Sequence, residues 1–141
     1  MIYAEELNFW QTSKSSPDIW VERTTRQIEA LGGKILADGF GSTLSGAAFM
    51  IGFALEGETF KIVWPVLPTK SGNARAAKVQ AATMLYHYIK GVALYALVVG
   101  SRTAFFSHLL LPDGKTLSEL TNEEIEDNIF STLQLMPGDD L

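Results

Sequence analysis

Two apolar runs joined by a two-residue turn constrain the fold of this chain more than any other part of its sequence. Residues 47–55 and 58–66 are rich in apolar and β-branched residues, and Glu56-Gly57 lies between them. A two-residue turn there predicts a β-hairpin over 47–66 in which Leu55 lies opposite Glu58. One face of that hairpin is then wholly apolar, with the cross-strand pairs Phe53 with Phe60, Ile51 with Ile62, Phe49 with Trp64, and Ala47 with Val66.

A helix is predicted before the hairpin, over residues 17–31. Ser16 is a suitable N-cap, and Pro17 fits the first helical position because its missing amide hydrogen has no helical partner there. Gly32-Gly33 supplies the stop. The residues between them form one stripe at helical spacing: Trp20, Thr24, Ile28 and Leu31.

A longer helix is predicted after the hairpin, over residues 73–98. One side of it is apolar, with Ala77, Ala81, Leu85, Tyr88, Val92, Tyr95 and Val99. The other side carries Asn73, Ala76, Gln80, Thr83, His87 and Lys90, and we expect that side to face solvent. The apolar side is expected to lie across the apolar face of the hairpin.

The fold class expected is α+β in a single domain. With 141 residues and 47% hydrophobic content, the chain is long enough for one core and too short for two. Because the apolar face of an antiparallel sheet must be covered, helices 17–31 and 73–98 are both expected on it. Residues 1–16 are interpreted as an N-terminal arm, and residues 113–141 as an acidic C-terminal extension.

The remaining segments are more weakly patterned. Residues 34–38 are predicted as a short strand, and the Gly- and Ser-rich residues 39–46 as a loop. Residues 103–111 are predicted as a further strand that ends at a turn over Pro112-Asp113-Gly114. A terminal helix is predicted over 122–133, with 137–141 frayed.

Charge is strongly segregated along this chain. Between Thr59 and Pro112 there is no acid, but there are six cations, whereas residues 113–141 hold eight acids and only Lys115. The formal net charge of -5 therefore combines a basic middle with an acidic end. Such a separation indicates either an anionic partner or neutralisation within the protein.

The start of the long helix is the predicted anion-binding site. A helix N-terminus offers unpaired amides and the positive end of the helix dipole, which suits phosphate. The candidate binding residues are Lys70, Ser71, Asn73, Arg75 and Lys78 around that N-terminus, with Lys61 and Lys90 as further contacts. The alternative interpretation is an ordinary solvated rim in which Asn73 only caps the helix.

The same segment resembles one known family. Ala74-Arg75-Ala76-Ala77-Lys78-Val79-Gln80-Ala81-Ala82 is similar to the Lys-Lys-x-Ala-Lys-x-x-Ala-Ala start of the closing helix in double-stranded-RNA-binding domains. The predicted order of helix, three strands and helix over 17–88 is also that of this family. The resemblance implies that Arg75 and Lys78 contact phosphates. Ala74 departs from the pattern because the family has a Lys there, and residues 45–48 lack the Pro and His of the family's minor-groove loop.

A metal-dependent nuclease is the alternative that the same element order leaves open. Such a site needs carboxylates on the central strands and an acid-x-Lys pair to hold a metal ion and position water. Here Glu58 and Lys61 are two residues apart instead of one, and only Asp38 and Glu56 remain as further carboxylates. We assign no catalytic residue, no metal ligand and no cofactor.

Histidine chemistry is also weakly indicated. His87 and His108 are the only histidines, and the adjacent Ser107 points to the opposite side from His108 on a strand. A direct Ser-His couple is therefore not expected.

The preferred function is a non-enzymatic nucleic-acid-binding or accessory protein, of the kind found in phages or mobile elements. The alternatives are a protein-interaction or self-assembling factor that uses the acidic end, which leaves a homodimer open, and a small nuclease.

The absence of cysteine fits a reducing cytoplasm. The acidic N-terminus lacks a secretory pattern, and the longest apolar run, 91–100, is too short to cross a bilayer, so a cytoplasmic protein without membrane association is expected.

Overall fold

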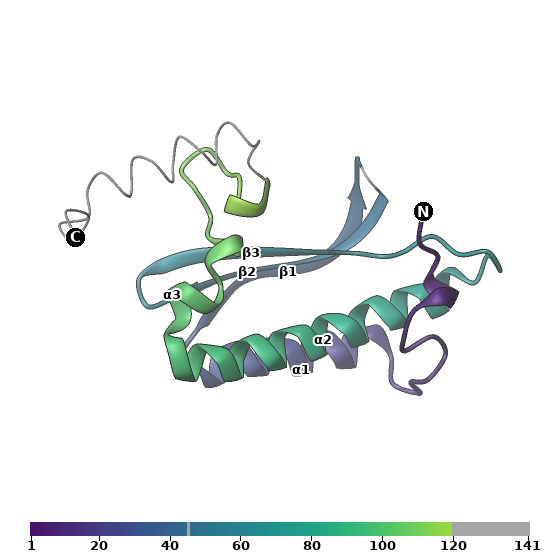
Figure 1. Cartoon of the computed structure of the whole chain (residues 1–141), viewed down its shortest axis with the longest axis horizontal. Coiled ribbons are helices and arrows are strands. Elements are labelled where there is room, and N and C mark those ends of the chain that lie inside the picture. The colour runs from purple at the N-terminus through teal and green to yellow at the C-terminus, as the bar shows by residue number, and fades with distance from the viewer. Residues whose placement is uncertain (45, 120–141) are drawn as a thin grey trace, which may run out of the picture.

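The fold is a three-stranded antiparallel sheet with two helices on one face (Figure 1). The computed structural model describes residues 1–44 and 46–119. The strands are β1 (Lys34–Thr43), β2 (Gly46–Leu55) and β3 (Glu58–Pro65), in the spatial order β1-β2-β3. The helices are α1 (Pro17–Ala30), α2 (Ala74–Val99) and the short α3 (Ser101–Ala104), with single 3-10 turns at Ala4–Glu6, Phe106–His108 and Leu117–Glu119. The α+β class and the single domain are therefore confirmed.

The hairpin register is confirmed residue for residue. Leu55 pairs with Glu58, and the inner-face pairs run from Phe53 with Phe60 to Phe49 with Trp64. Glu56 and Gly57 both adopt positive φ angles, 52° and 80°. This is the backbone of the tight turn whose twist matches that of the flanking strands, which is why a two-residue connection suffices here.

The predicted loop over 39–46 is wrong, because β1 continues through most of it to Thr43. Gly39 and Gly41 lie within the strand, paired with Met50 and Ala48 of β2. A glycine-rich stretch is a poor strand by itself, but here β2 supplies a full set of antiparallel partners. The register shifts once, between Ile35 and Ala37.

The core lies between the inner face of the sheet and the two helices, as predicted. Both helices run in the same direction along the sheet (Figure 1). Ser16 caps α1 by accepting a hydrogen bond from the Ile19 amide at 3.4 Å. The buried cluster comprises Ile28, Phe49, Ile51, Phe53, Leu55, Phe60, Ile62, Ala81, Ala82, Leu85, Ile89, Ala96 and Phe105.

The two sides of α2 differ from the prediction at four residues. Gln80 and Thr83 are buried instead of exposed, and Tyr95 and Val99 are exposed instead of buried. The Gln80 side-chain amide donates to the carbonyls of Ala4 at 2.7 Å and Asn8 at 3.0 Å. The reason is that the first half of α2 is covered by the N-terminal arm and α1 as well as by the sheet, which a single helical stripe cannot indicate.

The predicted strand over 103–111 is also wrong. Gly100, with a φ of +95°, ends α2, and the chain continues as α3 and a 3-10 turn. Only two bridges remain from the strand, Phe60 with Leu109 and Leu110 with Thr116. Phe105 decides this geometry, because its side chain is fully buried against Phe53 and Phe60.

The turn at 112–114 is present, and the Gly114 amide donates to the Leu111 carbonyl at 2.9 Å. The helix predicted over 122–133 and the frayed end at 137–141 lie outside the described residues.

Candidate functional site

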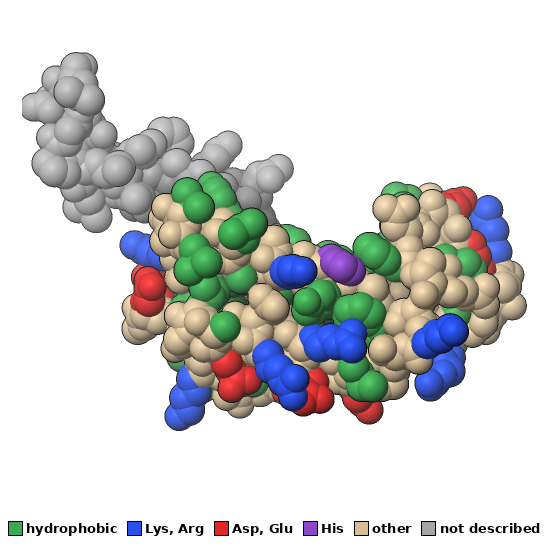
Figure 2. Space-filling model, turned by 90° about the horizontal axis from the view of Figure 1, so that it is seen from below, with side chains coloured by type: hydrophobic (Ala, Val, Ile, Leu, Met, Phe, Trp, Pro, Cys, Tyr) green, Lys and Arg blue, Asp and Glu red, His purple; other side chains and the backbone are tan. Residues whose placement is uncertain are grey.

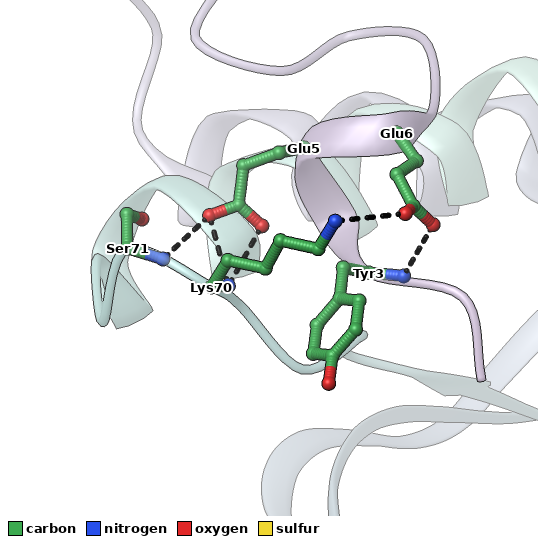
Figure 3. Close-up of polar contacts among 5 residues, drawn as sticks. All are labelled: Tyr3, Glu5, Glu6, Lys70 and Ser71. Atoms are coloured by element: carbon green, nitrogen blue, oxygen red, sulfur yellow. Dashed lines mark hydrogen bonds and ion pairs between the residues drawn. The ribbon is translucent and has the colours of Figure 1, made fainter.

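The loop that leads into α2 is held by two carboxylates of the N-terminal arm. The Glu5 carboxylate accepts hydrogen bonds from the backbone amides of Lys70 at 3.0 Å and Ser71 at 2.8 Å (Figure 3). The arm is fixed alongside by the Ala4 amide, which donates to the Pro68 carbonyl at 2.8 Å. Two amides of this loop therefore bind an anion, and that anion is a side chain of the same molecule.

Glu6 neutralises the Lys70 side chain. The Lys70 Nζ lies 3.2 Å from a Glu6 carboxylate oxygen and 5.1 Å from the centre of the Tyr3 ring. The Tyr3 amide donates to the same carboxylate at 3.0 Å (Figure 3). Both the amide and the ammonium of Lys70 are thus engaged within the protein.

These contacts change the acidity of both carboxyl groups. Desolvation raises the pKa of Glu5, but the hydrogen bonds from the amides of Lys70 and Ser71 outweigh it and lower that pKa to about 2. The amide of Tyr3, followed by the Lys70 side chain, lowers the pKa of Glu6. Both groups are therefore charged in the folded protein at neutral pH.

Three further amides at this junction, those of Gly72, Asn73 and Ala76, also have partners within the chain. The Asn73 side chain caps α2 by accepting from the Ala76 amide at 3.0 Å. The Ser71 hydroxyl accepts from the Asn73 amide at 3.2 Å, and the Thr69 hydroxyl accepts from the Gly72 amide at 3.0 Å. Ser71 and Asn73, predicted as ligand-binding residues, therefore both act in closing the turn.

Arg75 and Lys78 remain oriented toward a groove at the same end of the molecule. This groove has a volume of about 960 Å³ and lies between the N-terminal residues, the end of β1 and the first turn of α2. Its lining includes Ile2, Phe40, Val66, Leu67 and Ala77 beside the two cations, and no acidic residue is among the described residues that line it. Within the described chain, Arg75 has no ion-pair partner.

Lys78 lies against an exposed aromatic ring. Its Nζ is 4.0 Å from the centre of the Phe40 ring, and Phe40 remains 44% exposed on β1. The Phe40 ring also contacts Phe49 of β2, with 4.8 Å between ring centres. The groove therefore combines two cations with an accessible aromatic surface.

Lys61 and Lys90 lie outside this groove. Lys61 is on the outer face of the sheet, opposite Gly52. Lys90 follows Lys78 by about 18 Å along α2, given a rise of 1.5 Å per residue, and its Nζ lies 6.0 Å from the centre of the Tyr86 ring. The structure thus brings Arg75 and Lys78 together at the groove, pairs Lys70 with Glu6 in the preceding loop, and leaves Lys61 and Lys90 apart.

The carboxylates that a nuclease would need do not converge. Glu58 forms an ion pair with Arg102 at 3.1 Å, and Glu56 accepts from the Ser101 hydroxyl at 3.5 Å. Asp38 lies opposite Ile51, four residues along β2 from the turn. Within residues 1–44 and 46–119, no group of three His, Asp or Glu side chains is arranged to hold a metal ion.

Each histidine contacts an aromatic side chain. The His87 ring stacks on Phe9 of the arm with 4.8 Å between ring centres. His108 Nε2 lies 2.6 Å from the Tyr88 hydroxyl, and burial lowers the pKa of His108 and raises that of Tyr88. The Tyr88–His108 pair joins α2 to the segment after it.

Sequence reasoning missed Glu5, Glu6 and Phe40. The two acids were visible as a pair in the arm, but nothing in their spacing indicates a contact with Lys70. Phe40 stood in a stretch interpreted as a loop, so no face could be assigned to it.

Comparison of the chain with protein-family models, with curated proteins and with solved structures finds no match. Helix α2 is long and apolar enough, by length and composition, to cross a membrane, a test that the core helix of a soluble protein also passes.

Proposed function

We propose that the protein is a non-enzymatic nucleic-acid-binding protein and that single-stranded nucleic acid contacts the groove at the start of α2. The observation that supports this most directly is the placement of Lys78 over Phe40 in a groove that Arg75 also lines. Proteins that bind single strands combine cations along the phosphate backbone with aromatic rings on which bases stack.

The groove suits a flexible strand better than a duplex. It is concave and largely apolar, so it can accept an unstacked base, whereas a duplex presents a rigid row of phosphates. Phosphates on either side of such a base would be within reach of Arg75 and Lys78, which lie three residues apart on one side of α2. The amides of Lys70 and Ser71 add nothing to this contact while Glu5 accepts hydrogen bonds from them.

The electrostatic part of this binding is expected to be modest. Two cations neutralise two phosphates, and each phosphate contact contributes about −0.7 to the slope of log K against log salt for single strands. A slope of roughly −1.4 is therefore expected for the wild-type protein.

The test is fluorescence polarisation with labelled single-stranded DNA, single-stranded RNA and duplex of equal length at two salt concentrations. Arg75→Glu and Lys78→Glu should each weaken binding to single strands and reduce the salt slope. Phe40→Leu keeps the apolar volume but removes the aromatic face, and should weaken binding by about 1–3 kcal/mol, the usual value of one stacked base.

Arg23→Glu is the matched control. Arg23 is exposed on α1 and lies 4.8 Å from the centre of the Trp20 ring, so it is a second cation over an aromatic ring, away from the groove. If Arg23→Glu weakens binding as much as Lys78→Glu does, only the general charge of the protein matters and the assignment of the groove is wrong.

A further inference from the structure

The last turns of α2 carry a hydrophobic surface that no described residue covers. Leu94, Leu97 and Val98 are 66%, 75% and 79% exposed, and Tyr95 and Phe106 are also more than half exposed. Figure 2 shows hydrophobic side chains gathered at the end of the molecule where α2 ends. Soluble proteins rarely leave so contiguous an apolar patch in water, so this terminal surface is expected to have an occupant.

The opposite side of the same turns already has its partners. Ala93 and Ala96 are buried, and Ala96 belongs to the core cluster. Leu94, Leu97 and Val98 lie on the side turned away from that core. The residues of the terminal surface therefore take no part in the core that stabilises the domain.

We infer that residues 120–141 of the same molecule cover this terminal surface. Their sequence has apolar residues at helical spacing, which on a helix would share one side: Ile125, Ile129, Leu133 and Met136. An amphipathic segment of this kind has one apolar side to bury, and the terminal surface of α2 offers an apolar area of the same kind.

The chain leaves the described part of the molecule at the correct end for this contact. The Leu110 amide donates to the Thr59 carbonyl at 2.9 Å, next to the β2–β3 turn, and the Leu117 amide donates to the Leu109 carbonyl at 3.3 Å. The same turn lies beside the end of α2, because the Ser101 hydroxyl donates to Glu56. Residues 120–124 span roughly 17 Å if extended at about 3.3 Å each, and a helix over 125–136 adds about 18 Å at 1.5 Å per residue.

Charge favours this occupant over a second copy of the chain. Residues 120–141 contain six acids and no cation, whereas the nearest cations along the chain are Lys90 on α2 and Arg102 on α3, and Arg102 is already paired with Glu58. A symmetric contact between two copies through α2 would bring like charges together, Lys90 near its counterpart. The short connection within one molecule also gives the segment a high effective concentration.

The test uses the full chain, which contains no native cysteine, so one introduced cysteine can be labelled selectively. Ser131→Cys creates a single attachment point for a spin label on the polar side of the segment, in protein labelled with nitrogen-15. The label should strongly reduce the amide signals of residues 94–99, and this loss should persist when the sample is diluted with excess unlabelled protein. Dilution separates contact within one molecule from contact between two.

Substitutions of exposed residues supply the control. Leu97→Gln with Val98→Gln removes the apolar contact without adding charge, and should restore the signals of the neighbouring amides. Leu36→Gln, at a residue that is 52% exposed on β1, should leave the signal loss unchanged. Because these side chains are exposed, their replacement does not disturb the core.

Three results would overturn the inference. The first is full signal intensity at residues 94–99 in the labelled protein. The second is a loss that disappears on dilution with unlabelled protein, which would assign the surface to a second copy. The third is a loss of the amide signals of residues 94–99 that occurs only when phosphatidylglycerol vesicles are added and does not depend on the spin label. That result would assign the terminal surface to a bilayer. None of these results depends on whether the groove binds nucleic acid.

Discussion

The carboxylate of Glu5 accepts hydrogen bonds from the amides of Lys70 and Ser71, which lie 65 and 66 residues further along the chain. This contact joins the N-terminal arm to the loop that begins α2. It also gives a loop rich in amide donors a permanent anion. The loop that was predicted to bind a ligand therefore stabilises the fold through its backbone amides.

Removal of the Glu5 charge should destabilise the protein. In Glu5→Gln a neutral side chain faces two amides that favour an anion, because hydrogen bonds to a charged acceptor are stronger than those to a neutral one. A lower midpoint of thermal unfolding is expected. Glu29→Gln, an exposed carboxylate at the end of α1, serves as the control and should change the midpoint less. Equal effects of the two substitutions would contradict a special role for Glu5.

Acid should remove the contribution of Glu5 within a defined pH range. The pKa of Glu5 is lowered from its usual 4.5 to about 2 in the folded protein, so the unfolded chain takes up the proton first as the pH falls. The stabilisation is therefore complete above pH 4.5 and is lost progressively toward pH 2. Unfolding midpoints measured from pH 7 to 2 should converge for wild type and Glu5→Gln. A difference that does not vary with pH would refute this assignment.

Removal of the Gln80 side-chain amide should lower the stability of the protein. The side chain is buried and donates to the carbonyls of Ala4 and Asn8, so Gln80→Leu keeps most of the volume and leaves both acceptors without that donor. We expect a loss of about 1–3 kcal/mol in the free energy of unfolding, measured by urea titration. Hydrogen exchange should also become faster at residues 4–8. An unchanged exchange rate there would mean that the arm is held by other contacts.

The adjacent residues Phe105 and Phe106 should respond very differently to truncation. Phe105→Ala removes a fully buried ring between Phe53 and Phe60, and should cost about 3–5 kcal/mol of unfolding free energy. Phe106 is 51% exposed, so Phe106→Ala should cost far less. Urea titration of both variants tests which of the two rings belongs to the core. Similar losses from the two substitutions would contradict the observed burial.

Local patterns predicted the parts of the fold whose determinants are close in sequence. The hairpin register follows from one turn, Glu56-Gly57, because a two-residue connection allows a single pairing of the strands that it joins. The bounds of α1 follow from a cap at Ser16 and glycines at its end. The start of α2 was predicted within one residue, because Asn73 caps the helix that begins at Ala74.

Contacts between distant segments decided the rest. Residues 39–43 became a strand because β2 lay beside them, and Phe105 turned inward because the sheet left a space for it. Glu5 and Glu6, which no periodicity could connect with Lys70, took the place predicted for an external phosphate.

The sequence by itself determined the β2–β3 hairpin, the two main helices and the cationic character of the segment that joins the hairpin to α2, because each depends on steric and hydrogen-bonding preferences within a few residues. Only the tertiary structure decided which cations remain available. Charge is neutralised through space, and the Glu6 carboxylate, 64 residues away in the sequence, lies 3.2 Å from the Lys70 ammonium that it neutralises.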